Sequence, residues 1–221
     1  MAVMLTLRVA LVASLASLPV AIAVGYVLAR REFPGKVLVD AFVHLPLVLP
    51  PVVTGYALLI LFGHNGLIGR FLEEIGIVLA FRWTGAALAA AIMAFPLMVR
   101  AIRLAFEAAD PRFEQAAASL GAAPLGRFLT IALPLAFPGI MAGLVLAFAK
   151  ALGEFGATIT FVSNIPGETQ TIATAIYTLL DIPGGEIRAW RLAAISVLIS
   201  FVALVVSDSL SRRRGRGASL Q

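Results

Sequence analysis

The sequence predicts an all-α polytopic membrane protein with about five transmembrane helices. Its residues are 61% hydrophobic and 13% charged, whereas soluble domains have roughly 45–50% apolar and about 25% charged residues. Long apolar runs, separated by short polar segments, carry this hydrophobicity. The absence of cysteine excludes a disulfide framework and a thiolate metal site. We attribute the formal net charge of +5 to basic cytoplasmic loops beside membrane lipid rather than to nucleic-acid binding.

A spanning helix needs about 20 mostly apolar residues, and five segments meet or approach that length. Within a single domain, residues 1–221, the expected spans are residues 5–29, 37–62, 83–104, 128–153 and 190–207. The first is interpreted as a retained span and not a cleaved signal, because its uncharged run ends in Arg30-Arg31 rather than in small residues. Two shorter apolar pieces, 155–167 and 169–180, are expected to form an extracytoplasmic loop and an interfacial helix, although joined they would add a sixth span.

The basic residues set the expected orientation, because cytoplasmic loops carry an excess of lysine and arginine. With the N-terminus outside and the C-terminus cytoplasmic, 11 of the 17 basic residues are cytoplasmic. These are Arg30, Arg31, Lys36, Arg100, Arg103, Arg112, Arg127, Arg212, Arg213, Arg214 and Arg216. The loop at residues 107–127 is then inside the cell.

That loop has the local signals of a short helix followed by a second one. Asp110 suits an N-cap and Pro111 a first helical position, while Gly121 can end the helix in a left-handed conformation. A second piece begins at Pro124. Such short helices are marginal alone, and an alanine-rich face ending in glycine suits close docking. The loop is therefore expected to be a docking element.

The order of Glu114, Ala116, Ala117 and Gly121 resembles the EAA motif of ABC importer permeases, although Gln115 separates the acid from the alanines. The resemblance implies that these four residues belong to cytoplasmic coupling helices, which sit in a groove of the ATPase subunit. The alternative is an ordinary helix–turn–helix between two spans.

The second expected span contains two consecutive prolines, which bend helices and free backbone carbonyls. In a membrane such carbonyls need partners or a water-filled cavity, so we expect Pro50, Pro51 and Thr54 to line a translocation path. Phe95, before Pro96 in the third span, is assigned to the same path or its gate. Simple packing of small residues is the alternative, and for Gly139 and Gly143 it is the interpretation we adopt.

Lys150 and Glu154 are four residues apart and share a helical face. They are expected to form either a structural ion pair near the interface or a polar element of an outer gate. Thr158 and Thr160 follow, and their hydroxyls could donate weak hydrogen bonds to an oxyanion in transit. An ordinary polar loop is the alternative.

No pattern in the sequence indicates catalysis. His44 and His64 have no partner at metal-ligand spacing, and no glycine-rich phosphate loop precedes the single Gly-Lys pair. We therefore expect no catalytic residue, no metal and no cofactor in this chain, which is not an enzyme and takes its energy from a partner that hydrolyses ATP.

The chain is similar to molybdate ABC importer permeases over nearly its whole length. The segments that carry the similarity are residues 31–36, 44–56, 94–105 and 152–171. Some members have an additional N-terminal span, which we do not expect here. The resemblance implies a type I ABC importer permease fold in the cell inner membrane and a homodimer. It also implies two ATPase subunits and an extracytoplasmic oxyanion-binding protein as partners.

The function implied by this resemblance is translocation of molybdate by alternating access. Tungstate, or sulfate and thiosulfate, are alternative substrates because related permeases share the architecture. An ATP-independent secondary transporter or channel is the alternative from a different class.

Overall fold

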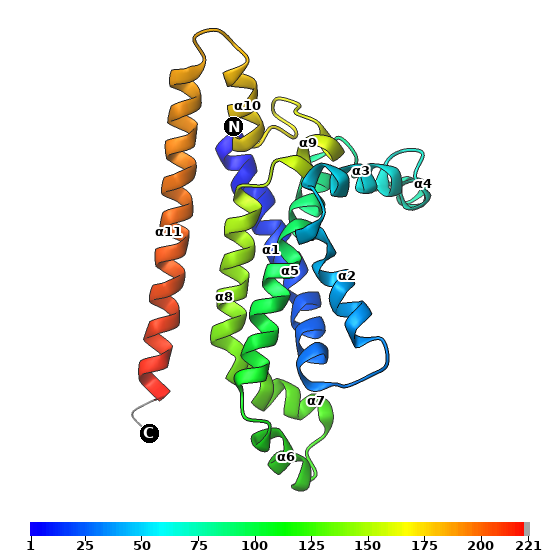
Figure 1. Ribbon diagram of the computed structural model, residues 1–221, viewed down its shortest axis with the longest axis vertical. Coiled ribbons are helices and arrows are strands. Elements are labelled where there is room, and N and C mark those ends of the chain that lie inside the picture. Colours follow the sequence, from blue (N-terminus) through cyan, green and yellow to red (C-terminus); the bar gives the residue numbers. More distant parts are fainter. Residues whose placement is uncertain (219–221) are drawn as a thin grey trace.

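The computed structural model describes residues 1–218, with side chains for residues 1–202 and 205, and every regular element in that part is a helix. The all-α prediction is confirmed. The helices α1 (Ala2–Arg30), α5 (Trp83–Ala108) and α8 (Leu133–Leu152) pack on one another as a bundle, and α11 (Glu186–Ala218) lies beside α8 (Figure 1). The basic tail expected at residues 212–216 lies outside the described side chains.

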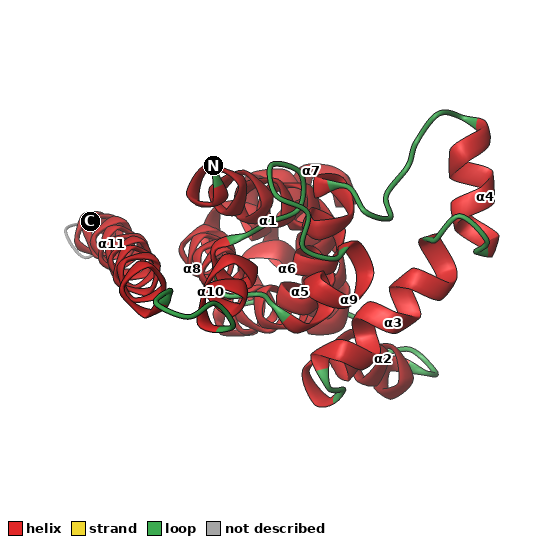
Figure 2. Cartoon of the chain, turned by 90° about the horizontal axis from the view of Figure 1, so that it is seen from above, coloured by secondary structure: helices red, strands yellow, loops and turns green. Residues whose placement is uncertain are grey.

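Three helical stretches in the described part are long and apolar enough to cross a membrane: α1, α5 and residues 124–152. The span expected at residues 37–62 is instead two half-length helices, α2 (Lys36–Val48) and α3 (Pro51–Phe62), bent by 112°. Because proline disfavours a helical conformation in the residue before it, Leu49 and Pro50 are extended and the first half ends there. Figure 2 shows α3 leading away from the bundle towards α4 (Leu67–Glu74).

The bundle is held by small residues that let helix backbones approach closely. Ala10, Ala13 and Ala21 of α1 are buried, as are Ala89 and Ala90 of α5. A Cβ added at Gly25 of α1 would lie 2.8 Å from a side-chain carbon of Ile102 in α5. Two buried clusters result, one around Phe161 at the N-terminal end and one around Phe106 at the other.

At the N-terminal end of the bundle, residues 155–180 form two short helices with a loop between them. These are α9 (Gly156–Val162) and α10 (Ile172–Leu180). Neither has the length of a span. The piece expected to be a loop, residues 155–167, contains the helix α9, and the interfacial position of residues 169–180 stays a prediction. The backbone N–H of Ile172 donates to the buried hydroxyl of Thr6, 2.8 Å away, so this segment is tied to the start of α1.

At the opposite end of the molecule lie α6 (Arg112–Ser119) and α7 (Pro124–Arg127) (Figure 1). Asp110 Oδ1 accepts from the backbone N–H of Arg112 at 2.9 Å, although the helix begins one residue later than expected, with Pro111 at the N-cap position. Gly121 has φ +83°, so its predicted left-handed conformation is confirmed. A π-helical turn that the sequence did not predict, η1 (Phe128–Ala132), then joins α7 to α8.

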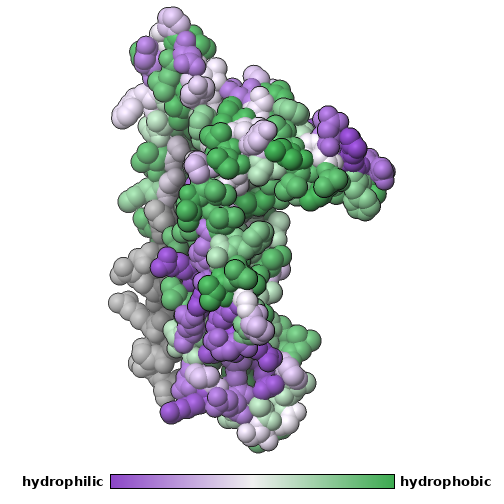
Figure 3. Space-filling model, turned by 45° about the vertical axis from the view of Figure 1, so that its right-hand side comes forward, coloured by the Kyte–Doolittle hydropathy of each residue, from purple (hydrophilic) through white to green (hydrophobic). Residues whose placement is uncertain are grey.

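The surface agrees with a membrane-embedded chain. Figure 3 shows hydrophobic residues over the middle of one face, and hydrophilic ones gathered at the lower end and at the tip of the projecting arm. Large exposed apolar side chains are numerous on α2 and α3, among them Phe42, Val48, Val52 and Tyr56. These helices therefore have faces suited to lipid or to another protein chain.

The contact between α3 and α9 gives a test of the packing. A Cβ at Gly55 would lie 2.6 Å from the carbonyl oxygen of Ala157, so Gly55→Ala should lower the free energy of unfolding by about 1–3 kcal/mol. Thermal unfolding followed by circular dichroism in detergent should show a loss of about 2–4 °C per kcal/mol. Gly153→Ala is the control, because nothing lies within 4 Å of its added Cβ. Equal midpoints for both variants would contradict this packing.

Candidate functional site

The candidate coupling residues of α6 do not all face the same way. Glu114 is turned towards α1, and only 14% of its side chain is exposed. Its Oε2 accepts from the hydroxyl of Tyr26 at 2.9 Å, and its Oε1 accepts from Nε of Arg30 at 3.0 Å. Arg30 also donates through Nη2 to the carbonyl of Ala109, 2.9 Å away. Both oxygens of the carboxylate are thus engaged within the chain.

The other three candidates lie on or near the outer surface of this end. Ala116 and Gly121 are exposed and Ala117 is half-buried. Leu120 between them is 89% exposed, and nothing lies within 4 Å of a Cβ added at Gly121. Small residues beside an exposed apolar side chain form a surface that a partner protein can approach closely. The structure therefore separates an inward Glu114 from an outward alanine–glycine face.

The sequence analysis did not identify the partners of Glu114. The ring of Tyr26 packs edge-on against Phe106 and Phe128, with centroids 5.2 and 4.8 Å away. It thus stands where α1, α5 and η1 meet. Arg30 was assigned only to the cytoplasmic side, and its position at the end of a span was the sole sequence signal that it could reach this loop.

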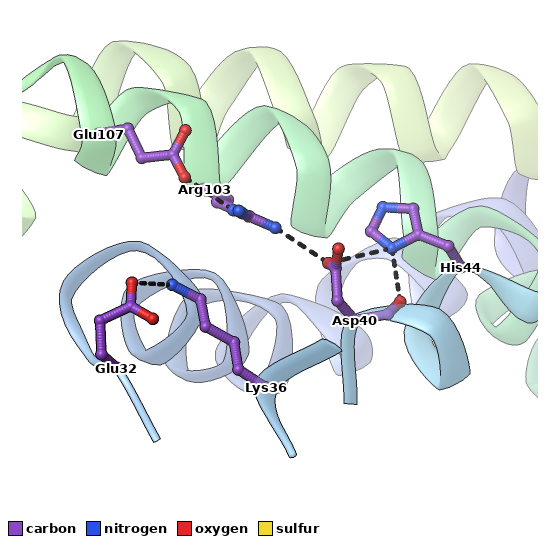
Figure 4. A network of polar contacts seen from close by, with 6 residues as sticks. All are labelled: Glu32, Lys36, Asp40, His44, Arg103 and Glu107. Carbon is purple, nitrogen blue, oxygen red and sulfur yellow. Dashed lines mark hydrogen bonds and ion pairs between the residues drawn. The ribbon is translucent and has the colours of Figure 1, made fainter. Parts of the chain in front are cut away.

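A second polar network joins the half-helix α2 to α5 (Figure 4). Arg103 donates through Nη1 to Asp40 at 3.0 Å and through Nε to Glu107 at 2.7 Å. His44 Nδ1 lies 2.9 Å from the backbone carbonyl of Asp40. His44 is thus held by Asp40 of its own helix. No group of metal-binding side chains occurs among the described residues.

Only some of the residues assigned to the translocation path lie close together in the structure. Pro51, in the first turn of α3, lies against α9, because a Cβ added at Gly156 would be 2.7 Å from the Cβ of Pro51. Thr54 is buried, and its hydroxyl has no hydrogen-bond partner within the described part of the chain. Phe95 lies apart from them, against the cluster around Phe106. Pro50, before α3, is exposed.

The threonines of α9 differ in their surroundings. Thr158 is fully buried, whereas Thr160 is half-buried and donates to the carbonyl of Gly156 at 2.9 Å. Both belong to a short helix that packs against α3 and α5. The contact of this helix with α3 thus unites most of the residues assigned to the path.

The expected pair of Lys150 and Glu154 is present, with Nζ 3.1 Å from Oε2. Glu154 lies beyond the end of α8 and is buried, and its other oxygen accepts from the backbone N–H of Ala157 at 3.1 Å. It therefore caps α9 while Lys150, with a third of its side chain exposed, balances its charge.

Residues 21–216 match the family described as the inner membrane component of binding-protein-dependent transport systems. The chain belongs to this family. This permease is 58% identical over 212 residues to the molybdenum transport system permease protein ModB of Escherichia coli, a match that covers 96% of the chain and 93% of that protein. It is 36% identical over 211 residues to the sulfate transport system permease protein CysT of Salmonella typhimurium, covering 94% and 76%.

Solved structures confirm the fold of the permease. A bacterial ABC transporter that imports alginate matches with a TM-score of 0.74 at 19% identity, covering 96% of this chain and 78% of that one. The MetNI methionine ABC transporter matches with a TM-score of 0.72 at 14% identity, covering 96% and 94%. The expectation of a type I ABC importer permease, an inner-membrane transport component that is not itself an enzyme, is confirmed.

The outward face of α6 gives a test of coupling. Valine at Gly121 would adopt a left-handed backbone at a cost of about 1–2 kcal/mol and would add bulk where a partner approaches. Gly121→Val should therefore lower substrate uptake per ATP hydrolysed by the assembled transporter in proteoliposomes. Gly76→Val is the matched control, because its φ is +81° and nothing lies within 4 Å of its Cβ. Normal uptake in the Gly121 variant would refute the coupling assignment.

The contribution of the Lys150–Glu154 ion pair to stability can be tested by substitution. Lys150→Met leaves a buried carboxylate without its counter-charge, and we expect a loss of about 1–3 kcal/mol in the free energy of unfolding. The double variant Lys150→Met/Glu154→Gln should recover most of that loss, because a glutamine oxygen can still accept from Ala157. Chemical unfolding in detergent measures both. A double variant no more stable than the single one would show that charge balance is not the reason for the pair.

Proposed function

We propose that this permease translocates molybdate across the inner membrane as part of an ATP-driven importer. The observation that carries the proposal is the 58% identity to a molybdenum transport permease over almost the full length of both proteins. A local likeness could reflect a shared coupling loop alone. A match that includes the bent span, the segment around α9 and the loop around α6 supports the same substrate class as well.

In the proposed assembly, two copies of the chain form a homodimer that two ATPase subunits grip from the cytoplasm. An extracytoplasmic binding protein delivers the oxyanion at the other face. The exposed apolar side chains of α2 and α3 support contact with a second copy or with lipid. The separation of α6 from the N-terminus supports an orientation with the N-terminus outside (Figure 1).

The mechanism we propose is alternating access. ATP binding closes the ATPase pair, and the face made by Ala116, Ala117 and Gly121 transmits that movement to the spans. The spans tilt and open a central path outwards, where the binding protein releases its anion. Hydrolysis then resets the path to face the cytoplasm. Nucleotide chemistry stays on the partner, so the permease itself needs no cofactor.

We assign the path to the contact between the bent span and α9. Pro50 and Pro51 interrupt the helix there, and Thr54, Thr158 and Thr160 add hydroxyls nearby. Hydroxyl groups suit an anion in transit, because a site that binds tightly releases slowly. Glu154 fixes the start of α9, and Phe95, near the middle of α5, is a candidate gate residue.

Sulfate is the second candidate substrate, because a sulfate permease is 36% identical over 94% of the chain. Isotope uptake into proteoliposomes that contain the permease, its ATPase and the binding protein distinguishes the oxyanions. We expect ATP-dependent uptake of molybdate and tungstate in preference to sulfate. Preferential uptake of sulfate would overturn the substrate, and uptake by the permease alone without ATP would overturn the transporter class.

A further inference from the structure

Docking of the outward alanine–glycine face on a partner does not explain why α6 is also bonded to the end of α1. We propose that Glu114, Arg30 and Tyr26 are positioning residues that tie α6 to the end of α1, and we call their contacts the strap. When α6 is docked on the ATPase, the strap passes the movement of α6 to the first span. This inference rests on the proposed function. It assigns Glu114 to the interior of the permease instead of to the ATPase surface.

The geometry supports an internal role for the carboxylate. Only 14% of the Glu114 and Arg30 side chains is exposed. Charge-assisted hydrogen bonds are about twice as strong as neutral ones, and Glu114 accepts one from Arg30 and a second bond from Tyr26. Both oxygens of this carboxylate already accept a bond from within the chain, and little of the side chain is exposed to a partner protein. The exposed Ala116 and Gly121 remain free to meet that partner.

The helix needs such a strap because its own packing is weak. α6 has eight residues, and none of them is buried. A helix of that length is marginal without tertiary contacts, so a directed polar contact has to fix its orientation. Arg30 is suited to this task, because it also donates to the carbonyl of Ala109, directly after the end of α5. One guanidinium thus holds both the connection into α6 and α6 itself.

The strap is connected to the opposite end of the bundle through one continuous helix, α1. α1 runs unbroken from Ala2 to Arg30 and packs against α5 through Gly25. Near its start, Thr6 accepts a hydrogen bond from the backbone N–H of Ile172, the first residue of α10. A displacement applied at Arg30 therefore reaches the segment that follows α9 without crossing a flexible loop. Rigid elements with polar contacts at both ends are suited to carry coupling between distant sites.

The test uses the complete transporter in proteoliposomes and measures substrate imported per ATP hydrolysed. Arg30→Gln should lower this ratio at least about fivefold, the lower end of typical coupling between sites, while ATP hydrolysis continues. The charge-swapped variant Arg30→Glu/Glu114→Arg should restore most of the ratio. Arg31→Gln, which removes an exposed neighbouring charge, is the matched control and should resemble the unmodified protein.

The outcomes separate this inference from the proposed function. Failure of the unmodified complex to import the anion would overturn the proposed function. Import by the unmodified complex with equal ratios in Arg30→Gln and Arg31→Gln would overturn the strap. A charge swap that stays as uncoupled as Arg30→Gln would also overturn it, because an opposite-charge pair between these two positions would then not be what couples α6 to α1.

Tyr26→Phe decides the question if Arg30→Gln does not assemble with its partners. This change removes one hydroxyl and keeps the ring packing on Phe106 and Phe128. The amount of substrate imported per ATP hydrolysed should fall, by a smaller factor than in Arg30→Gln. The thermal stability of the complex should be unchanged. A ratio equal to that of the unmodified protein would overturn the strap.

Discussion

Close contact between helices lined with alanine and glycine is the constraint on which the rest of this structure depends. Lipid tails are as apolar as the side chains they surround, so burial from water cannot drive these helices together. Dispersion contacts between backbones have to do so. Ala10 and Ala13 of α1 and Ala89 and Ala90 of α5 are fully buried, and Gly25 and Gly143 receive side chains of α5. Both ends of the bundle are positioned by this close-packed middle.

The same constraint explains where polar groups are tolerated. Glu114 and Glu154 stand near opposite ends of the bundle, and each is bonded to a basic side chain and to one further donor. A carboxylate that was buried alone in such surroundings would favour its neutral form. Because each acid joins a short helix to a long one, charge balance and mechanical connection are provided by the same contacts.

Local chemistry made part of this structure predictable from sequence. The Asp110 cap, the left-handed Gly121 and the Lys150–Glu154 pair each involve residues at most a few positions apart, and all three are present. The proline pair predicted an irregular span, but its direction depends on how Gly55 and Gly156 let α3 meet α9. Glu114 and Arg30 are 84 positions apart, so only the packing of α1 on α5 could show that they meet.

The π-turn η1 has a consequence for how residues are distributed around α8. One extra residue in a turn rotates everything that follows by about 100° relative to a regular α-helix. Side chains of α7 and α8 therefore do not follow one continuous 3.6-residue repeat, although the backbone between them is unbroken. Deleting a single residue from Phe128–Ala132 would leave each helix intact yet turn the buried stripe of α8, Ala136, Ile140 and Gly143, away from α5.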